Sequence, residues 1–366
     1  MLRHAQHERK KCCNDSRLIP FALSLSKGKR RVVEHAVMTH TPVALFLTIV
    51  LFCGVALAQD LTKAKQEEHI VFYTSWGPSD ADYVIKAFEK KYPFLRVELA
   101  RSSSEKTLNR LLTEQRANRF LGDVVAISGI QSGILKEKGA LDRYQSKEAV
   151  NFPTEWRDPD GYGVGLHQTI YVIGYNSKLV PADAVPKRYE DLLNPRWKRQ
   201  LAWDPEEYYL FGALMKARGK EKGLEFWRRL AEQQVNFRKG YTLITELLSA
   251  GEFPVTVSLY QHRVDEYIDK GAPVQWVAPN PLVGGDPNRI ALLKNAPRPS
   301  AAKIFIDFML SVEGQKLLQD RGRSPGRIGL GPKNPRLKGA KVFTFHVNSG
   351  EYEQLGKEFN KVFKVQ

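Results

Sequence analysis

Cysteine is nearly absent from this chain of 366 residues, and it is confined to one end. The three cysteines are Cys12, Cys13 and Cys53, so residues 59–366 carry no thiol. This distribution excludes disulfides, thiolate metal sites and a cysteine nucleophile from the body of the protein.

Motifs of the common enzyme classes are also missing. The nearest approach to the Gly-x-Ser-x-Gly turn of the α/β hydrolases places Ser132 one position late. Neither a dinucleotide-binding glycine pattern after a strand, nor a Walker lysine, nor a His-Glu-x-x-His helix occurs. His167, His262 and His346 are isolated, and we expect structural or surface roles for them. We therefore expect a binding protein; the alternatives are a secreted α/β hydrolase-like enzyme, which would show turnover, and an adhesion protein, which would lack a pocket.

Positive charge is in excess, but it is not concentrated in one block. The formal net charge is +16, of which residues 1–58 contribute +6. Because the remaining excess is spread along the chain, no nucleic-acid partner is expected. A basic surface of this kind favours the recruitment of anions.

One long apolar run stands near the start of the chain. It covers Pro42–Ala58 and ends in Ala-Leu-Ala, the small-x-small pattern that precedes a signal-peptidase cut. The run is shorter than the roughly 20 residues that a membrane-spanning helix needs. We therefore expect a cleavable signal peptide, cut after Ala58, and a periplasmic location, in preference to a membrane anchor. Basic residues lie only farther upstream, so Met38 is an alternative start and residues 1–37 an extension without a fold of their own.

The stretch around which the rest is organised is Ile70–Pro93. A buried strand, Ile70–Tyr73, runs into a helix with apolar residues at helical spacing. The polar turn between them offers Ser79 or Asp80 as the N-cap, with Pro78 in the loop just before it. Free N–H groups at the start of such a helix favour an anion or a polar solute. By itself, the stretch also fits the first β-α unit of any α/β domain.

Two more β-α units follow. Strand Arg96–Ala100 leads to helix Lys106–Asn118, and strand Gly122–Ile127 leads to helix Ile130–Glu137. Successive units of this kind indicate a parallel, doubly wound sheet with its solute cleft beyond the carboxyl ends of the strands. Serines at these positions are first of all helix caps. The polar residues expected to meet on one rim are Thr74, Ser75, Ser103, Ser104 and Ser128.

A second α/β unit occupies the middle of the chain, and the length of the chain suggests two domains. Thr169–Tyr175 is extended and apolar, which suits a strand that crosses between two lobes. Strands Leu201–Trp203 and Pro254–Leu259 alternate with helices, and the second of them leads to Tyr260. A final amphipathic helix is expected over Tyr352–Phe363.

Seven segments in this order point to a known family: Val71–Thr74, Phe88–Pro93, Gly122–Val125, Tyr175–Leu179, Tyr189–Lys198, Ser249–Glu252 and Ala296–Lys303. Their order and spacing, over about residues 70–329, resemble the bacterial extracellular solute-binding proteins of the ferric-iron type, which serve ABC importers. The resemblance implies the type II periplasmic binding protein fold, an α/β fold with two Rossmann-like lobes joined by crossing hinge strands.

The resemblance also implies how the chain is divided. Residues 59–174 and 279–330 would form the first lobe and residues 175–278 the second. An upstream extension with the signal peptide would cover residues 1–58, and a C-terminal loop and helix residues 331–366. The implied partners are a small solute and the membrane permease of an ABC importer; the protein is expected to be a monomer without a cofactor.

The ferric ligands of the family carry over only in part. The positions of its histidine and glutamate fall near Gly77 and Ser128, and its tyrosine pair falls on Tyr260 and Gln261. Ferric iron favours phenolate and carboxylate oxygens, so Tyr260 is the one possible metal ligand. The expected cargo is therefore a ferric complex with a bound anion, or a small phosphorylated or carboxylated compound. The adjacent pair Tyr208–Tyr209 is expected to serve helix packing.

We expect the solute to lie between the lobes, oriented by hydroxyl and helix N-terminal N–H groups and shaped by aromatic rings. The first lobe would contribute Thr74, Ser75, Trp76, Ser103, Ser104 and Ser128, and the second Trp203, Tyr241, Thr242 and Tyr260.

Overall fold

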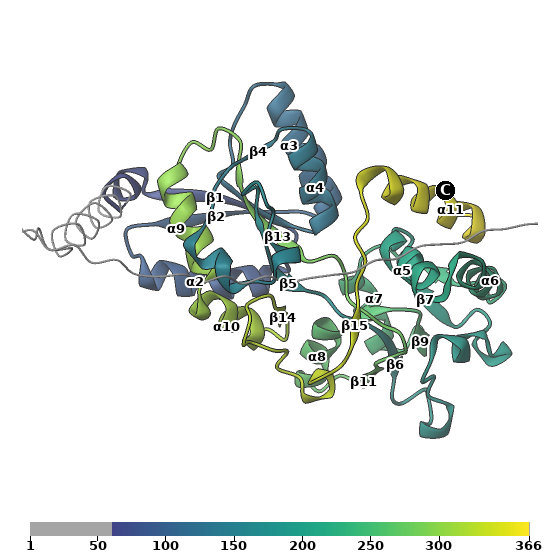
Figure 1. Ribbon diagram of the computed structural model, residues 1–366. Coiled ribbons are helices and arrows are strands. Elements are labelled where there is room, and N and C mark those ends of the chain that lie inside the picture. The colour runs from purple at the N-terminus through teal and green to yellow at the C-terminus, as the bar shows by residue number, and fades with distance from the viewer. Residues whose placement is uncertain (1–60, 366) are drawn as a thin grey trace, which may run out of the picture. The chain divides into compact units, whose positions relative to one another are not determined.

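The computed structural model describes residues 61–365, and these residues form two α/β lobes (Figure 1). The expected signal peptide, its cut after Ala58 and the three cysteines lie outside the described residues. The first lobe opens with the three β-α units that the sequence predicts. They are β1 (His69–Thr74) with α2 (Pro78–Lys91), β2 (Arg96–Arg101) with α3 (Ser104–Arg116), and β3 (Val124–Ile127) with α4 (Gly129–Glu137).

Alternation along β1 gives the first sheet two buried faces, because successive side chains of a strand point to opposite sides. Ile70 and Phe72 are fully buried in a cluster that also contains apolar residues of α2 and α9 (Pro299–Leu310). Val71 and Tyr73 lie on the other face, in a cluster with leucines of α3 and α4. Figure 1 shows α2, α9 and α10 (Val312–Asp320) on one side of this sheet and α3 and α4 on the other.

The three β-α units pair in parallel, as predicted, and the antiparallel strands added beside them make the first sheet mixed. β1 pairs in parallel with β2 and β3, whereas β13 (Asn288–Leu293) is antiparallel to both β3 and β5 (Val164–Gln168). The strand order is β14-β5-β13-β3-β1-β2, with β14 (Ser324–Pro325) at one edge and β4 (Leu141–Asp142) paired to β13. Parallel neighbours need a crossover connection, but β13 arrives from the second lobe and enters in the opposite direction.

The second lobe is built on a six-stranded sheet of order β10-β6-β9-β7-β8, with β11 also paired to β6. Its strands are β6 (Tyr171–Asn176), β7 (Leu201–Trp203), β8 (Asn236–Phe237), β9 (Val255–Thr256), β10 (Leu259–Tyr260) and β11 (Val274–Val277). Its helices are α5 (Tyr208–Arg218), α6 (Lys220–Ala231), α7 (Tyr241–Ala250) and α8 (Gln261–Asp269). Aromatic stacking fills its core, where Trp203 and Trp227 lie 5.0 Å apart between ring centroids.

The lobes are connected where β5 gives way to β6. Because β5 belongs to the first sheet and β6 to the second, the chain crosses at Thr169 and Ile170, before the strand rather than along Thr169–Tyr175 as predicted. The chain returns between β11 and β13. The C-terminal segment passes to the second lobe once more, where β15 (Val342–Phe343) pairs with β12 (Leu282–Val283) and leads to α11 (Ser349–Phe363).

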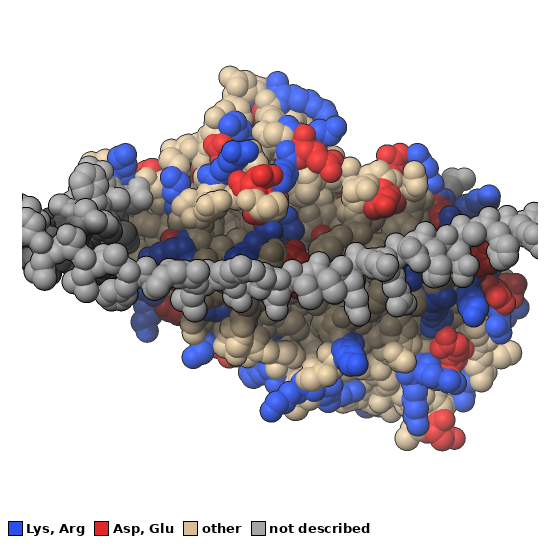
Figure 2. All heavy atoms as spheres, in the orientation of Figure 1, with Lys and Arg blue, Asp and Glu red and all other residues tan. Residues whose placement is uncertain are grey.

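Short 3-10 helices occupy the connections: η1 (Lys147–Asn151), η2 (Thr154–Trp156), η3 (Ala182–Ala184), η4 (Tyr189–Leu193), η5 (Pro195–Trp197) and η6 (Pro335–Leu337). Over residues 61–365, none of the helices combines the length and the apolar character that crossing a membrane requires. Figure 2 shows lysine and arginine side chains interspersed with aspartate and glutamate on the visible face.

Candidate functional site

A cleft of about 1300 Å³ is lined by residues of both lobes and of α11. Eight of the ten residues predicted for the site line it: Ser75, Trp76, Ser103, Ser104, Ser128, Tyr241, Thr242 and Tyr260. The polar ends of β1 and β3 and the starts of α3 and α7 therefore do converge, as the rule for strand ends in α/β sheets requires.

Thr74 and Trp203 are the two predicted residues that do not line the cleft. The Thr74 hydroxyl is fully buried, donates to the Ala126 carbonyl at 2.8 Å and accepts the Trp76 amide at 3.3 Å. Trp203 is also fully buried, and its Nε1 donates to the Ser258 hydroxyl at 2.9 Å. Both side chains make hydrogen bonds inside their own lobe and do not reach the cleft. This corrects the expectation that they face the solute.

The start of α2 differs from the prediction. Gly77 is the N-cap residue and Pro78 is the first residue of the helix, so neither Ser79 nor Asp80 is the cap. Proline suits this position because its missing N–H would have no partner in the helix anyway. Asp80 consequently sits inside the first turn, where its carboxylate is free to bind other side chains.

The serines of the first lobe tie the starts of α3 and α4 together at the cleft. Ser103 caps α3 as predicted, since its hydroxyl accepts the Lys106 amide at 3.3 Å. The Ser104 hydroxyl accepts the Ser128 amide at 3.2 Å, and the Ser128 hydroxyl donates to Gln131.

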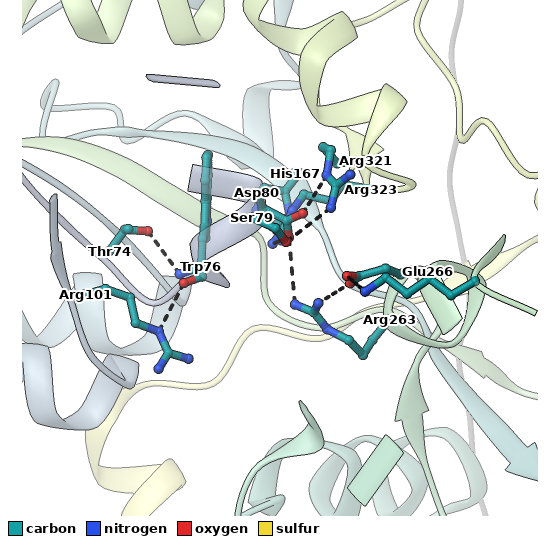
Figure 3. A network of polar contacts seen from close by, with 11 residues as sticks. Thr74, Trp76, Ser79, Asp80, Arg101, His167, Arg263, Glu266, Arg321 and Arg323 are labelled. Atoms are coloured by element: carbon teal, nitrogen blue, oxygen red, sulfur yellow. Dashed lines mark hydrogen bonds and ion pairs between the residues drawn. The ribbon is translucent and has the colours of Figure 1, made fainter. Parts of the chain in front are cut away.

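Asp80 is the centre of a network of arginines (Figure 3). It accepts hydrogen bonds from Arg321 Nε at 2.8 Å and from Arg323 Nη2 at 2.7 Å, both within the first lobe. Arg263 of α8, in the second lobe, approaches the same carboxylate to 3.8 Å. Burial opposes the charge on Asp80, but the arginines outweigh it and the pKa of this carboxyl is lowered. Asp80 is therefore ionised in the folded protein at neutral pH.

The positive charge in this network exceeds the negative charge. Arg263 finds a second carboxylate in Glu266, but the buried Nε of Arg323 and Nδ1 of His167 have no hydrogen-bond partner within residues 61–365. Burial and the charge of Arg323 lower the pKa of His167, so this ring is neutral. Arg101 adds another guanidinium at the cleft, where its Nε donates to the Trp76 carbonyl at 3.2 Å. Arginines therefore outnumber carboxylates in this network.

Glu207 dominates the opposite wall, on the second lobe. It is buried and accepts hydrogen bonds from the hydroxyls of Tyr171 at 2.9 Å and Tyr241 at 2.6 Å. Burial raises the pKa of Glu207 to about 7, partly against the effect of these donors. Tyr260 lies next to Tyr241, with ring centroids 4.2 Å apart, and stacks on His262. Burial and Glu207 raise the pKa of Tyr260 well above its usual value, so its phenol keeps its proton.

Four cleft residues were not singled out from the sequence: Arg101, Arg263, Arg323 and Glu207. His167 and His262, expected in structural or surface roles, also line the cleft. The glycine at position 77 is the one local sign of Arg263 in the sequence. In the structure, a Cβ on Gly77 would stand 2.8 Å from Nη2 of Arg263. The absence of a side chain there makes room for a guanidinium from the other lobe. Tyr208 packs on α11 and Tyr209 on Phe345, as the packing expectation requires, although both also line the cleft.

Metal-ligating groups are sparse in the part of the chain that the structure describes. No three or more His, Cys, Asp or Glu side chains gather there in an arrangement that would hold a metal ion. Iron held directly would have to rely on phenols such as Tyr260, whose ring lies against those of Tyr241 and His262.

Comparison with known proteins gives a consistent picture. The sequence model of a family described as bacterial extracellular solute-binding protein matches residues 131–345. An uncharacterized protein from Haemophilus influenzae is 24% identical over 293 residues, which cover 76% of this chain and 82% of that protein.

Two solved structures share the fold. The periplasmic binding protein AfuA from Actinobacillus pleuropneumoniae, with exogenous fructose-6-phosphate bound, has a TM-score of 0.66 at 20% identity. The match covers 81% of this chain and 96% of AfuA. Iron-bound HitA from Pseudomonas aeruginosa has a TM-score of 0.65 at 19% identity, with 81% and 98% of the two chains covered. The fold is thus that of the type II periplasmic binding proteins.

Proposed function

This chain belongs to the bacterial extracellular solute-binding proteins, which serve ABC importers, and we propose that its own cargo is a small organic anion. The anionic group would lie at the arginine end of the cleft, against Arg101, Arg263 and Arg323. The rest of the solute would extend toward the tyrosines around Glu207. Hydroxyls and amides at the starts of α3 and α4 would orient it, and Trp76 would shape the pocket.

One observation carries this choice of cargo: the network around Asp80 has more guanidinium groups than carboxylates. Arg321, Arg323 and Arg263 share the Asp80 carboxylate, and only Arg263 has a further acid. A buried cation without a counter-ion is costly, so an anion entering the cleft relieves that cost. Bidentate guanidinium groups are the preferred partners of phosphate and carboxylate oxygens.

A bare ferric ion fits the arginine end of the cleft poorly, because it would add three positive charges to those of the arginines. A ferric complex is compatible with the site when its bound anion occupies the arginine end and Tyr260 faces the metal. We therefore propose that iron, if carried, is carried as such a complex. The protein would use no cofactor of its own.

We propose that the solute is returned unchanged rather than transformed. Among residues 61–365, no serine hydroxyl is hydrogen-bonded to a histidine; the hydroxyls of Ser103, Ser104 and Ser128 meet the Lys106 amide, the Ser128 amide and Gln131. The protein would act as a periplasmic monomer after removal of residues 1–58 and would pass its solute to the membrane permease of the importer. Closure of the lobes would draw its free energy from contacts made only around the solute.

The test is native mass spectrometry of the purified protein, followed by thermal unfolding with inorganic phosphate, fructose 6-phosphate, citrate and ferric citrate. Fructose is the uncharged control, and ferric chloride tests the bare ion. A ligand present at about 100 times its Kd should raise Tm by roughly 5 °C. Stabilisation by the anions but not by fructose supports the proposal. Stabilisation by ferric chloride alone, or turnover of a ligand, would contradict it.

A further inference from the structure

The C-terminal helix α11 stands apart from the rest of the cleft wall, because the family match ends at residue 345, before the helix begins at Ser349. Asn348 caps it, and its carboxamide oxygen accepts the Glu351 amide at 2.9 Å while Glu351 accepts the Asn348 amide at 3.1 Å. This capping box defines where the helix begins and how the chain enters it. The start of α11 is therefore specified by its own sequence.

One face of α11 anchors it to the second lobe. Phe359 is fully buried, with its ring centroid 5.1 Å from that of Trp203 and 5.5 Å from that of Phe211. Leu355 packs so closely over Gly212 that a Cβ there would stand 2.6 Å from its Cδ1. Residues at this spacing share one side of a helix. The helix is therefore packed mainly on the second lobe.

A second face of α11 is turned to the cleft. Its lining residues recur at helical spacing: Ser349, Tyr352, Gly356 and Asn360, with Glu353 and Lys357 beside them. Burial against the core explains Phe359, Leu355 and part of the Tyr352 ring, but it does not explain the polar residues of this stripe or the direction of the Tyr352 hydroxyl. Gly356 keeps the helix close, since a Cβ there would already lie 3.1 Å from the Tyr208 ring.

Tyr352 is the residue of this stripe best suited to contact a solute. Its ring lies 5.5 Å from that of Tyr208, and the side chain is half-buried. Within residues 61–365 its hydroxyl makes no hydrogen bond, unlike those of Tyr171, Tyr209 and Tyr241. Burial, Glu207 and Glu105 raise its pKa, so the phenol is a neutral donor. A half-buried donor without a partner is satisfied when an acceptor enters the cleft.

We propose that α11 forms a wall of the solute site and that the Tyr352 hydroxyl donates a hydrogen bond to an uncharged oxygen of the bound solute. This inference rests on the proposed function and deepens it. Glu105, Glu206 and Glu207 line the same cleft as Tyr352 and add to the effect of burial in raising its pKa, so they disfavour an anionic group on this side. The solute is therefore an anion at one end and an oxygen-bearing, uncharged body at the other, as in a phosphorylated polyol.

The experiment compares the full chain with Tyr352→Phe in calorimetric titrations with fructose 6-phosphate and with inorganic phosphate. The variant removes only the hydroxyl, so fructose 6-phosphate should bind about fivefold more weakly while phosphate binding stays within twofold. Tyr83→Phe, at an exposed tyrosine of α2 outside the cleft, is the matched control and should leave both affinities unchanged.

The outcomes separate the two proposals. Equal affinities of the wild type and Tyr352→Phe for fructose 6-phosphate would overturn the role of Tyr352 and leave the proposed function standing. An equal loss of affinity for inorganic phosphate in Tyr352→Phe would also overturn the role of Tyr352, because that result would show a general disturbance of the cleft. Failure of the wild type to bind either ligand or citrate would overturn the proposed function and this inference together.

Discussion

Arg263 of α8 lies 3.8 Å from Asp80 of α2, so an ion pair joins the two lobes across the cleft. The same carboxylate oxygen accepts a hydrogen bond from Arg323 at 2.7 Å. Asp80 alone cannot neutralise every guanidinium that approaches it when the lobes come together. A bound anion would supply the missing charge, which links the capture of the solute to the closed arrangement.

The first prediction concerns the guanidinium that reaches across. Arg263→Gln removes a positive charge from the cleft but leaves Asp80 paired with Arg321 and Arg323. Loss of a charge-assisted contact to the solute should weaken binding of fructose 6-phosphate about tenfold or more. Calorimetric titration measures it, with Arg143→Gln, outside the cleft, as the control. Equal affinities of Arg263→Gln and the wild type would exclude Arg263 from the site.

Asp80 should govern stability at acid pH. Its pKa is lowered in the folded protein, so its charge stabilises the fold above the unfolded pKa of about 3.9, and this contribution is lost as the pH falls through the folded pKa. Asp80→Asn leaves buried arginines unpaired and should lower the free energy of unfolding by about 3 kcal/mol at pH 7. Thermal unfolding between pH 3 and 7 should show that the difference in stability between the wild type and Asp80→Asn becomes smaller below about pH 4. A constant difference would refute the assignment.

Glu207 should make the fold less stable as the pH rises, which is opposite to the effect of Asp80. Its pKa of about 7 in the folded protein lies above the unfolded value of 4.5, so the folded state holds a proton that the unfolded state releases. Stability should fall as the pH rises from about 4.5 to about 7, by up to about 3 kcal/mol. Glu207→Gln keeps the shape without the titration, so its free energy of unfolding in urea should change less between pH 5 and pH 8. Identical pH dependence in both proteins would argue against this role.

Two hydroxyls predicted from the sequence have effects on binding alone. Tyr260→Phe and Ser128→Ala should each weaken fructose 6-phosphate binding by about threefold to tenfold, the range expected for one neutral hydrogen bond. Neither change should unfold the protein, since Tyr260 remains packed on Tyr241 and Ser128 is at a helix start. Calorimetry with far-UV circular dichroism checks both statements. Unchanged affinity in both variants would remove these residues from the site.

The sequence was informative where function follows from local order along the chain. The rule that polar turns follow buried strands in α/β units located Ser75, Ser104 and Ser128 on the cleft without any knowledge of pairing. Thr74 followed the same rule, but its hydroxyl turned back to Ala126. A one-dimensional pattern gives the position of a residue at a strand end and leaves the direction of its side chain open.

The arginine network could not be predicted from the sequence for a different reason. Arg323 meets Asp80 across 243 positions of sequence, and Arg263 reaches it from the other lobe. No periodicity links such residues, and each of them alone reads as an ordinary surface charge. The sequence predicts that the chain crosses between the lobes along Thr169–Tyr175, because this apolar run is continuous. Only strand pairing shows that the run already belongs to the second sheet from Tyr171 onward.

The last prediction concerns the end of α11 that touches the first lobe. The Ser349 hydroxyl donates to Glu137 Oε2 of α4 at 2.8 Å, while the helix itself is anchored on the second lobe by Phe359. A contact between lobes that forms on closure stabilises the closed form and not the open one. Ser349→Ala should therefore speed dissociation of fructose 6-phosphate by about threefold, because a partly exposed hydrogen bond contributes less than 1 kcal/mol. The association rate should not change, since the solute enters the open form.

Stopped-flow measurement of tryptophan fluorescence separates the two rates, because Trp76 lines the cleft. Ser349→Thr retains the hydroxyl and is the matched control, expected to release the solute at close to the wild-type rate. If Ser349→Ala slowed association instead, the contact would act before the solute is bound and would not belong to closure. If neither rate changed, α11 would form a passive wall of the cleft, and the free energy of closure would have to come from Arg263 and the solute alone.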